Sequence, residues 1–328
     1  MNQITNLSSE YVPCDLCGST DHELVYSKID SHTGLEFHLV ACACGMAFVN
    51  PMPTDESIPR LYPEDYLQAK EYQTLMYRRM LSFLPPPQGK RLLDIGCGRG
   101  DFIEYASKNG WEVQGVDKLR WETPYLVPVT VGDFLTMDVA PGSFDAVTAW
   151  AILEHVRTPS AFFRKIRTLL TDNGRFVFTV PNVDAPGMRI SCSEDVPRHL
   201  WLFSPETVRR YLDDAGMEPV LISHNAKIYT SYPFGLVRYA VARLRAKDLT
   251  CAQYENKSVA LLRNRQITRN LGLWVREVLT RIGPWDLVLD AVDLAVGLGV
   301  SYWARLSRNY GVLTVVARKR DERTPVHS

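Results

Sequence analysis

The chain has 328 residues, enough for one large domain or two of ordinary size. Hydrophobic residues make up 46% and charged residues 23%, which excludes a disordered or fibrous protein. The 37 basic and 37 acidic residues cancel, which argues against a general nucleic-acid binder. No apolar run reaches the roughly 18 residues of a membrane span, and the polar start lacks the pattern of a secretory signal. We therefore expect a cytoplasmic protein.

Four of the seven cysteines fall within the first 44 residues, as the pairs Cys14/Cys17 and Cys42/Cys44. In a cytoplasmic protein such clustering favours metal binding over disulfides. The stretch between the pairs predicts a hairpin with strands over 23–26 and 37–41. Two thiolate pairs on two turns can complete a structural, tetrahedral zinc site and leave no open position for a catalytic metal. The second pair is C-x-C instead of C-x-x-C, so His22, His32 or His38 could be recruited, and buried or redox-active thiols are the alternative.

Residues 51–89 are proline-rich at both ends and predict one helix, over 64–83. Residues 90–225 alternate short apolar runs with amphipathic stretches, which predicts βα units and a mostly parallel sheet covered by helices on both faces. We expect strands over 91–96, 111–117, 127–132, 144–150, 175–180 and 217–223, with a last strand over 311–319. We expect helices over 101–109 and 160–170, and a third that begins at Pro205 with Ser204 as its N-cap and ends at Gly216. The segment 118–126 is too short for the usual crossover helix.

A glycine-rich loop, Gly96-Cys-Gly-Arg-Gly100, lies where the first strand of this region meets its helix. Glycine at 96, 98 and 100 allows sharp turns and close approach of a ligand, and the helix start offers free N–H groups. The dinucleotide-binding pattern requires glycine at 101, where Asp101 would be a poor neighbour for a pyrophosphate. The loop therefore favours a phosphate-free zwitterion, the methionine end of S-adenosylmethionine.

Acidic residues follow the loop at the ends of successive predicted strands. Asp94 is placed for the ammonium group, and Asp117, about twenty residues on, suits the two ribose hydroxyls. Asp133 and Phe134 would supply a carboxylate for the adenine amino group and a ring beside its face. Any one carboxylate alone could be a solvated turn residue, but three in order behind one loop favour a cofactor site. The predicted cofactor-binding residues are Asp94, Gly96, Cys97, Gly98, Gly100, Asp117, Asp133, Phe134 and Trp150.

These motifs, together with Phe144-Asp-Ala-Val, Leu153-Glu-His-Val156 and Val180-Pro-Asn182, resemble those of class I S-adenosylmethionine-dependent methyltransferases, in the ubiquinone-biosynthesis-like small-molecule branch. The resemblance covers about residues 88–225 and the last strand. It implies a doubly wound, seven-stranded Rossmann-like sheet whose last strand inserts antiparallel. The cysteine region, with its run Gly45-Met-Ala-Phe-Val-Asn-Pro51, resembles the zinc ribbon found ahead of some small-molecule methyltransferases.

Two histidines are candidates for the chemistry, because transfer to a hydroxyl or acidic carbon requires removal of a proton. His155 follows the fourth predicted strand and His199 the fifth, on the carboxyl side of the sheet where ligands of α/β folds bind. The resemblance also implies that both lie near the methyl group. We predict His199 or His155 as general base. Alternatively, His155 fixes the cofactor loop and His199 makes a structural hydrogen bond.

The C-terminal third is basic: from Ala226 onward there are 17 Lys/Arg and 8 Asp/Glu, so residues 1–225 carry a net charge of −9. Residues 226–310 are helical in pattern, and the Arg-rich segment 233–281 predicts either a solvated cap or dimer surface, or a surface that docks on anionic lipid headgroups or on a nucleotide-linked, lipid-linked or polyanionic acceptor. The predicted organisation is therefore a zinc ribbon (1–50), a linker with a helix (51–89), a methyltransferase core (90–225), a helical cap (226–310) and a last strand with tail (311–328).

The expected activity is methyl transfer to a small molecule. Acceptors in order of preference are a sugar or sugar nucleotide of surface or secondary metabolism, a phenol or quinone ring, and a lipid, with O-transfer favoured. A non-catalytic cofactor-binding scaffold and an RNA or protein methyltransferase are the alternatives. The absence of an Asn/Asp-Pro-Pro-Tyr/Phe motif after the fourth predicted strand argues against amino methylation of nucleic acid.

Overall fold

A computed structural model describes residues 7–30, 32–62, 74–121, 124–185, 195–224, 228 and 311–320, with short helical runs between 288 and 302. Contacts divide the chain into two units, and the sheets described below lie in the first, formed by residues 1–183, 196–229 and 312–328. The predicted cap over 226–310 falls almost wholly outside the described residues. Within the described part of the chain, no helix is long and apolar enough to cross a membrane.

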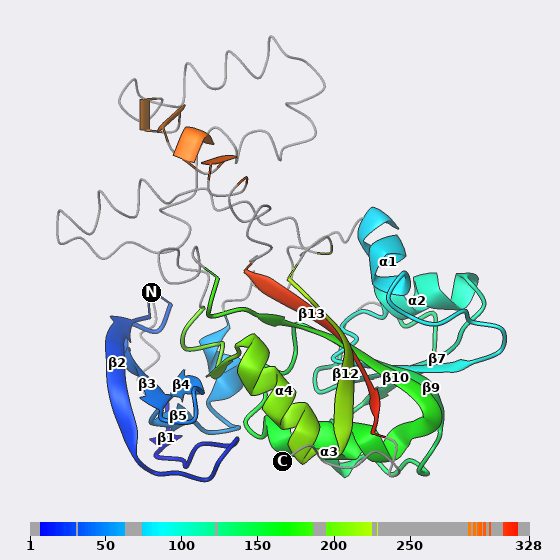
Figure 1. Cartoon of the computed structure of the whole chain (residues 1–328), viewed down its shortest axis with the longest axis horizontal. Coiled ribbons are helices and arrows are strands. Elements are labelled where there is room, and N and C mark those ends of the chain that lie inside the picture. The colour runs from blue at the N-terminus through cyan, green and yellow to red at the C-terminus, as the bar shows by residue number, and fades with distance from the viewer. Residues whose placement is uncertain are drawn as a thin grey trace. The chain divides into compact units, whose positions relative to one another are not determined.

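The predicted seven-stranded sheet is confirmed, with the order β12-β13-β10-β9-β6-β7-β8 (Figure 1). Its strands are β6 (Arg91–Ile95), β7 (Glu112–Asp117), β8 (Val129–Val131), β9 (Phe144–Trp150), β10 (Leu170–Pro181), β12 (Met217–Ser223) and β13 (Val312–Lys319). The five strands from β8 to β10 in this order are parallel to their neighbours. The last strand, β13, lies between β10 and β12 and is antiparallel to both, as the resemblance implied.

Helices cover both faces of the sheet. They are α1 (Thr74–Leu81), α2 (Asp101–Lys108), α3 (Pro159–Leu169) and α4 (Pro205–Asp214). Because successive strand residues point to opposite faces, Leu92 packs with α1 and α2 while Leu93 packs with α3 and α4. The predicted N-cap of α4 is confirmed, since Ser204 Oγ accepts the Thr207 N–H at 3.1 Å. Short 3-10 helices cover Ile58–Leu61 (η1) and Phe134–Thr136 (η2).

The N-terminal region forms a second, antiparallel sheet of order β11-β4-β3-β2. Its strands β2 (His22–Ile29), β3 (Glu36–Cys42) and β4 (Ala47–Val49) include the predicted hairpin, and β1 (Ser9–Glu10) pairs with β5 (Met52–Pro53). The fourth strand, β11 (Trp201–Leu202), comes from the segment between β10 and α4. The domain limits stay a prediction, but the ribbon shares its sheet with β11 and a hydrophobic core with residues of the large sheet.

The glycine loop packs tightly against β7. A Cβ atom on Gly115 would lie 2.6 Å from Cys97 Sγ and 2.7 Å from Ile103 Cδ1, whereas one on Gly132 would meet nothing within 4 Å. Neither glycine has a positive φ. We therefore expect Gly115→Ala to cost about 1–3 kcal/mol of unfolding free energy through overpacking and Gly132→Ala to change it little, as measured by denaturant unfolding. Adding Cys97→Ala to Gly115→Ala should recover part of the loss, and equal effects of the two single variants would contradict this packing.

Candidate active site

The loop after β6 has the backbone that its glycines predict. Gly96, Gly98 and Gly100 have φ values of +68°, +57° and +82°, in the left-handed region that favours glycine. The Gly96 and Cys97 N–H groups bond to the Val116 carbonyl at 2.8 and 3.2 Å, which ties the loop to β7. A Cβ atom added to Gly98 would meet nothing closer than 4.0 Å. The loop therefore leaves room for a ligand to lie against its backbone at Gly98.

Asp94, at the end of β6, is 2% exposed, and its Oδ1 accepts a hydrogen bond of 2.6 Å from Thr148 Oγ1. Burial raises the pKa of Asp94 to about 8, the Thr148 hydrogen bond opposes the rise, and the charge of Asp117 adds to it. A buried carboxyl group with one hydrogen bond is stabilised in its ionised form by a neighbouring cation. This site suits the ammonium group that the sequence predicts there.

Asp117, at the end of β7, is half-buried and bonded to two backbone N–H groups. Its Oδ2 accepts from Gly98 and its Oδ1 from Leu119, both at 2.8 Å. Burial raises the pKa of Asp117, and these two hydrogen bonds lower it. The structure thus places Asp117 beside the glycine loop, and its contact with ribose stays a prediction.

Asp133 and Phe134 follow β8 but face different surroundings. Asp133 Oδ1 accepts the Leu135 N–H at 2.8 Å, and Oδ2 lies 3.9 Å from the Lys118 ammonium. The Phe134 ring is 4% exposed and packs against Phe162 with ring centroids 5.1 Å apart. This packing gives Phe134 a place in the core, and a contact of its ring with adenine stays a prediction.

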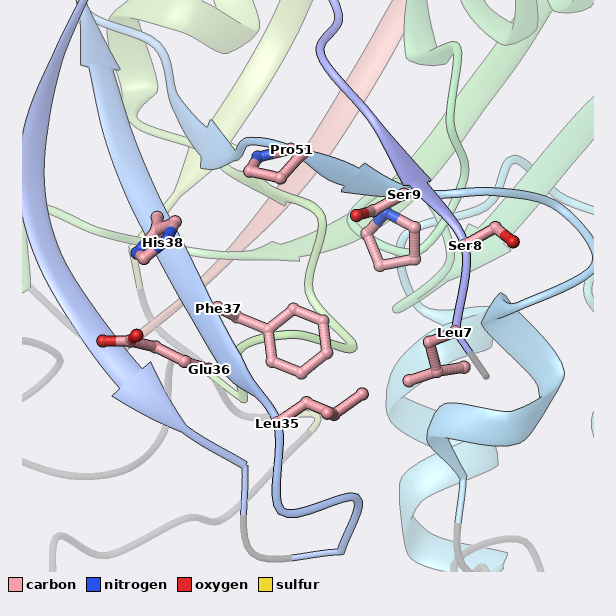
Figure 2. A pocket seen from close by; sticks show the side chains of 9 residues that line it. Leu7, Ser8, Ser9, Leu35, Glu36, Phe37, His38 and Pro51 are labelled. Carbon is pink, nitrogen blue, oxygen red and sulfur yellow. The ribbon is translucent and has the colours of Figure 1, made fainter. Parts of the chain in front are cut away.

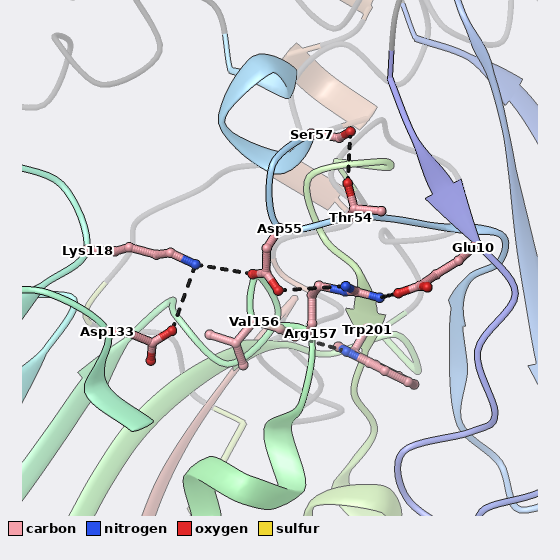
Figure 3. A network of polar contacts seen from close by, with 9 residues as sticks. All are labelled: Glu10, Thr54, Asp55, Ser57, Lys118, Asp133, Val156, Arg157 and Trp201. Carbon is pink, nitrogen blue, oxygen red and sulfur yellow. Dashed lines mark hydrogen bonds and ion pairs between the residues drawn. The ribbon is translucent and has the colours of Figure 1, made fainter. Parts of the chain in front are cut away.

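Ion pairs that the sequence analysis did not identify connect the segment after β5 to the strand ends (Figure 3). Lys118 Nζ lies 3.1 Å from Asp55 as well as near Asp133, and Arg157 pairs with Asp55 at 3.7 Å and with Glu10. The pairs with Asp55 and with Glu10 join residues more than 60 positions apart in the chain, so no local pattern could reveal them.

Two indoles lie beside the loop. Trp150, at the end of β9, packs edge-on against Phe102 of α2, with ring centroids 5.5 Å apart. The sequence did not reveal Trp121. The Arg99 guanidinium lies over its ring, with Cζ 5.3 Å from the ring centroid. Among the described residues, the buried Nε1 atoms of both indoles have no hydrogen-bond partner. Cys97 is buried, and burial raises its pKa, which suits a small packing residue better than a nucleophile.

The two predicted histidines lie together. The His155 and His199 ring centroids are 4.8 Å apart, with an interplanar angle of 67°. His155 Nδ1 lies 3.0 Å from both the Arg198 carbonyl oxygen and the Tyr62 hydroxyl. Since a carbonyl oxygen only accepts, we assign the Nδ1–H tautomer to neutral His155, which leaves the lone pair on Nε2. Tyr62 is a neighbour that the sequence did not reveal.

One turn joins the histidines to the glycine loop. The His155 N–H bonds to the Ile152 carbonyl at 2.9 Å. The Ile152 side chain lies directly over Gly96, where an added Cβ would fall 2.1 Å from Ile152 Cδ1. The turn of the candidate base His155 therefore packs, through Ile152, against the glycine loop that is the candidate cofactor cradle.

The four predicted metal ligands converge. Cys14 Sγ lies 3.6 Å from Cys44 Sγ, Cys17 Sγ lies 3.4 Å from Cys42 Sγ, and all four sulfur atoms are within 4.8 Å of one another. Tetrahedral zinc with bonds of about 2.3 Å places sulfur atoms about 3.8 Å apart, so the four thiols fit this ion. His22 bonds instead to the Ser19 carbonyl and Asn50, and His38 to Ser27. The short C-x-C pair closes the cluster without a histidine.

A small hollow of about 160 Å³ opens elsewhere, between the N-terminal strand and the β2–β3 hairpin (Figure 2). Leu7, Leu35, Phe37 and Pro51 are among the residues that line it, and it contains none of the predicted site residues. The hollow therefore shares no lining residue with the candidate active site.

The sheet order, the glycine loop and the acidic strand ends are typical of the Rossmann-like fold of class I S-adenosylmethionine-dependent methyltransferases. Residues 69–222 match the family model described as a methyltransferase domain. A ubiquinone biosynthesis O-methyltransferase of Chromobacterium violaceum is 35% identical over 108 residues, 30% of this chain and 47% of the relative. One from Cereibacter sphaeroides is 30% identical over 164 residues, 44% of this chain and 66% of the relative.

The chain spans about half the length of the first of these relatives, 44–48% in four of them. Among solved structures, a SAM-dependent methyltransferase from Archaeoglobus fulgidus is 18% identical and has a TM-score of 0.46, with 78% of this chain and 97% of the other covered.

Proposed function

We propose that the protein transfers a methyl group from S-adenosylmethionine to a hydroxyl group of a small-molecule acceptor, with a histidine as general base. The observation that carries the proposal is the continuity of the site: the turn that holds His155 also places Ile152 over Gly96 of the glycine loop. The turn that carries one candidate base therefore packs directly against the loop that would hold the cofactor.

The residues around the loop fit the cofactor. S-adenosylmethionine, when bound, supplies an electrophilic methyl group on a sulfonium. Asp94 would hold the ammonium group, because among the described residues its buried carboxyl has only Thr148 as a hydrogen-bond donor. Asp117 would hold the ribose hydroxyls while it keeps the Gly98 N–H in place. Asp133, Phe134 and Trp150 complete the predicted cofactor-binding set, with Asp133 and Phe134 proposed for the adenine.

We assign the proton transfer to His199, with His155 as the alternative base. The His155 ring is fixed by contacts of its Nδ1 atom with Arg198 and Tyr62, which directs Nε2 away from both. Its position against His199 lets it orient that ring. The neutral imidazole accepts the acceptor's hydroxyl proton as the oxygen becomes nucleophilic.

The acceptor class follows the sequence-based order, with a sugar, a sugar nucleotide or another surface or secondary metabolite first. The alternative, a phenol or quinone ring, is supported by the relatives that are described as ubiquinone biosynthesis O-methyltransferases.

The four clustered thiols support a structural zinc ion. Membrane contact or dimerisation through the basic segment concerns residues outside those described, and the cytoplasmic location rests on the sequence alone.

Calorimetry with S-adenosylhomocysteine tests the cofactor assignment. We expect one site per chain, with binding unaffected by NAD or ATP. Methyl transfer is then measured with labelled S-adenosylmethionine against panels of sugar nucleotides and of catechols. Binding of NAD or ATP without binding of S-adenosylhomocysteine would contradict the proposal, and turnover of the catechol panel alone would favour the ring acceptor.

A further inference from the structure

The segment that carries His199 forms part of the cysteine ribbon's sheet. In β11, Trp201 is in register with Phe48 and Leu202 with Ala47 of β4. The Val49 N–H bonds to the Leu200 carbonyl at 2.9 Å, and the Phe48 and Trp201 rings stack with centroids 4.7 Å apart. Both rings are fully buried. The position of His199 is thus set, on one side, by the strand that follows the second cysteine pair.

The same segment is bonded on its other side to the turn of His155. The Leu200 and Trp201 N–H groups donate to the Glu154 carbonyl at 2.7 and 3.3 Å. The Trp201 indole N–H donates to the Val156 carbonyl at 3.0 Å (Figure 3). The backbone that follows His199 is therefore bonded to the ribbon on one side and to the turn of His155 on the other.

A buried ion pair adds a second connection to the ribbon. Arg198 Nη1 lies 3.2 Å from Asp30 Oδ1, with the side chains 12% and 2% exposed, and it also donates to the Leu61 carbonyl. Asp30 directly follows β2 at the hairpin tip and accepts hydrogen bonds from the N–H and hydroxyl of Thr33. The Arg198 side chain bonds to the hairpin, and its carbonyl oxygen accepts from His155 Nδ1. Arg198 therefore links the hairpin to the group that fixes the tautomer of His155.

Both cysteine turns also bond to helices of the large sheet. The Asp15 carboxylate, between Cys14 and Cys17, accepts the N–H and hydroxyl of Ser160 at 2.8 and 2.9 Å. It thereby caps the start of α3, where the N-cap residue Thr158 makes no side-chain cap. Arg210 of α4 donates to the Cys44 carbonyl at 2.8 Å.

We propose that the cysteine ribbon is the positioning element of the catalytic histidines: Asp30 and β4 hold Arg198 and β11 so that His199 faces His155. This inference rests on the proposed function, because it assigns the ribbon to the proton-transfer part of that site. Asp30 and Arg198 are positioning residues in this scheme and need not touch substrate. The cofactor cradle, on β6 and β7, is predicted to be independent of them.

Asp30→Asn tests the proposal in the full-length protein, with Asp15→Asn as a second variant and Glu218→Gln as control. Glu218 pairs with Arg318 between β12 and β13, away from the ribbon sheet. For Asp30→Asn we expect kcat to fall about tenfold or more while the dissociation constant of S-adenosylhomocysteine stays within about twofold. Amide hydrogen exchange in residues 198–203 should accelerate about tenfold and that in 92–101 should not. Asp15→Asn should accelerate amide exchange in residues 198–203 less than Asp30→Asn does. Glu218→Gln should change neither the exchange rates nor kcat.

Unchanged exchange in 198–203 in both ribbon variants would overturn the inference, as would a uniform acceleration across the chain with parallel loss of cofactor affinity. The exchange arm needs no acceptor. If the wild-type protein fails to bind S-adenosylhomocysteine, the proposed function fails, and exchange in 198–203 alone decides whether the ribbon holds this segment.

Discussion

His199→Ala is expected to lower kcat by about 10²–10⁴-fold, the usual contribution of a general base. The His199 imidazole lies beside His155, and the turn of His155 packs against the glycine loop. From this position His199 can accept the proton of an acceptor hydroxyl. The affinity for S-adenosylhomocysteine should stay within about twofold, because the cradle residues lie on β6 and β7. A methyl-transfer assay together with calorimetry measures both quantities.

The pH profile separates a base from a structural histidine. A base must be neutral to accept a proton, so wild-type kcat should rise with pH along an acid limb, and His199→Ala should lose that limb. Tyr62→Phe is the matched control: it removes one contact of His155 Nδ1 but retains the Arg198 carbonyl as acceptor. If His155→Ala removes the limb and His199→Ala does not, the base is His155. Turnover retained in both alanine variants would contradict either assignment.

The large sheet could be predicted from the sequence because its signals are local. Most of its strands are short apolar runs with Gly or Pro near one end, and β9 and β12 have the predicted limits. The strand β10 begins five residues earlier than expected, at Leu170, which pairs with Phe144 before an irregularity in register. That pairing depends on a neighbouring strand, so the local sequence around Leu170 does not indicate it.

The contacts that organise the catalytic side are long-range and were missed. The strand β11 has two residues, too few for any periodicity, and its partner β4 lies about 150 positions away. Tyr62, Asp30 and Asp15 are ordinary residues in the sequence, and only the fold brings them to His155, Arg198 and Ser160. Phe134 shows the converse limit, since a Gly-Asp-Phe motif cannot indicate which way its ring packs.

Asp94→Asn is expected to act in opposite directions on stability and on cofactor binding. In the cofactor-free protein, burial raises the pKa of Asp94 to about 8, whereas an unfolded Asp titrates near pH 3.9. Between these values the unfolded state releases a proton that the folded state keeps, so the contribution of Asp94 to stability is present below about pH 4 and is lost as pH rises to about 8. An uncharged Asn avoids this loss. Thermal unfolding should therefore show the variant more stable by up to about 5 kcal/mol at pH 9, at about 1.4 kcal/mol per pH unit between the two pKa values, and nearly unchanged at pH 4.

Binding should change with the other sign, because the ligand's ammonium group requires the ionised carboxylate. Wild-type affinity for S-adenosylhomocysteine should rise by up to about tenfold per pH unit between pH 6 and 8, with a proton released on binding. The Asn variant should lose this dependence and bind about 10–100-fold more weakly at pH 8, the usual worth of a hydrogen bond to a charged group. Thr148→Val, which removes the hydroxyl that donates to Asp94, should shift the dependence to higher pH without abolishing it. Affinity independent of pH in the wild type, with no loss in Asp94→Asn, would show that the ammonium group is held elsewhere.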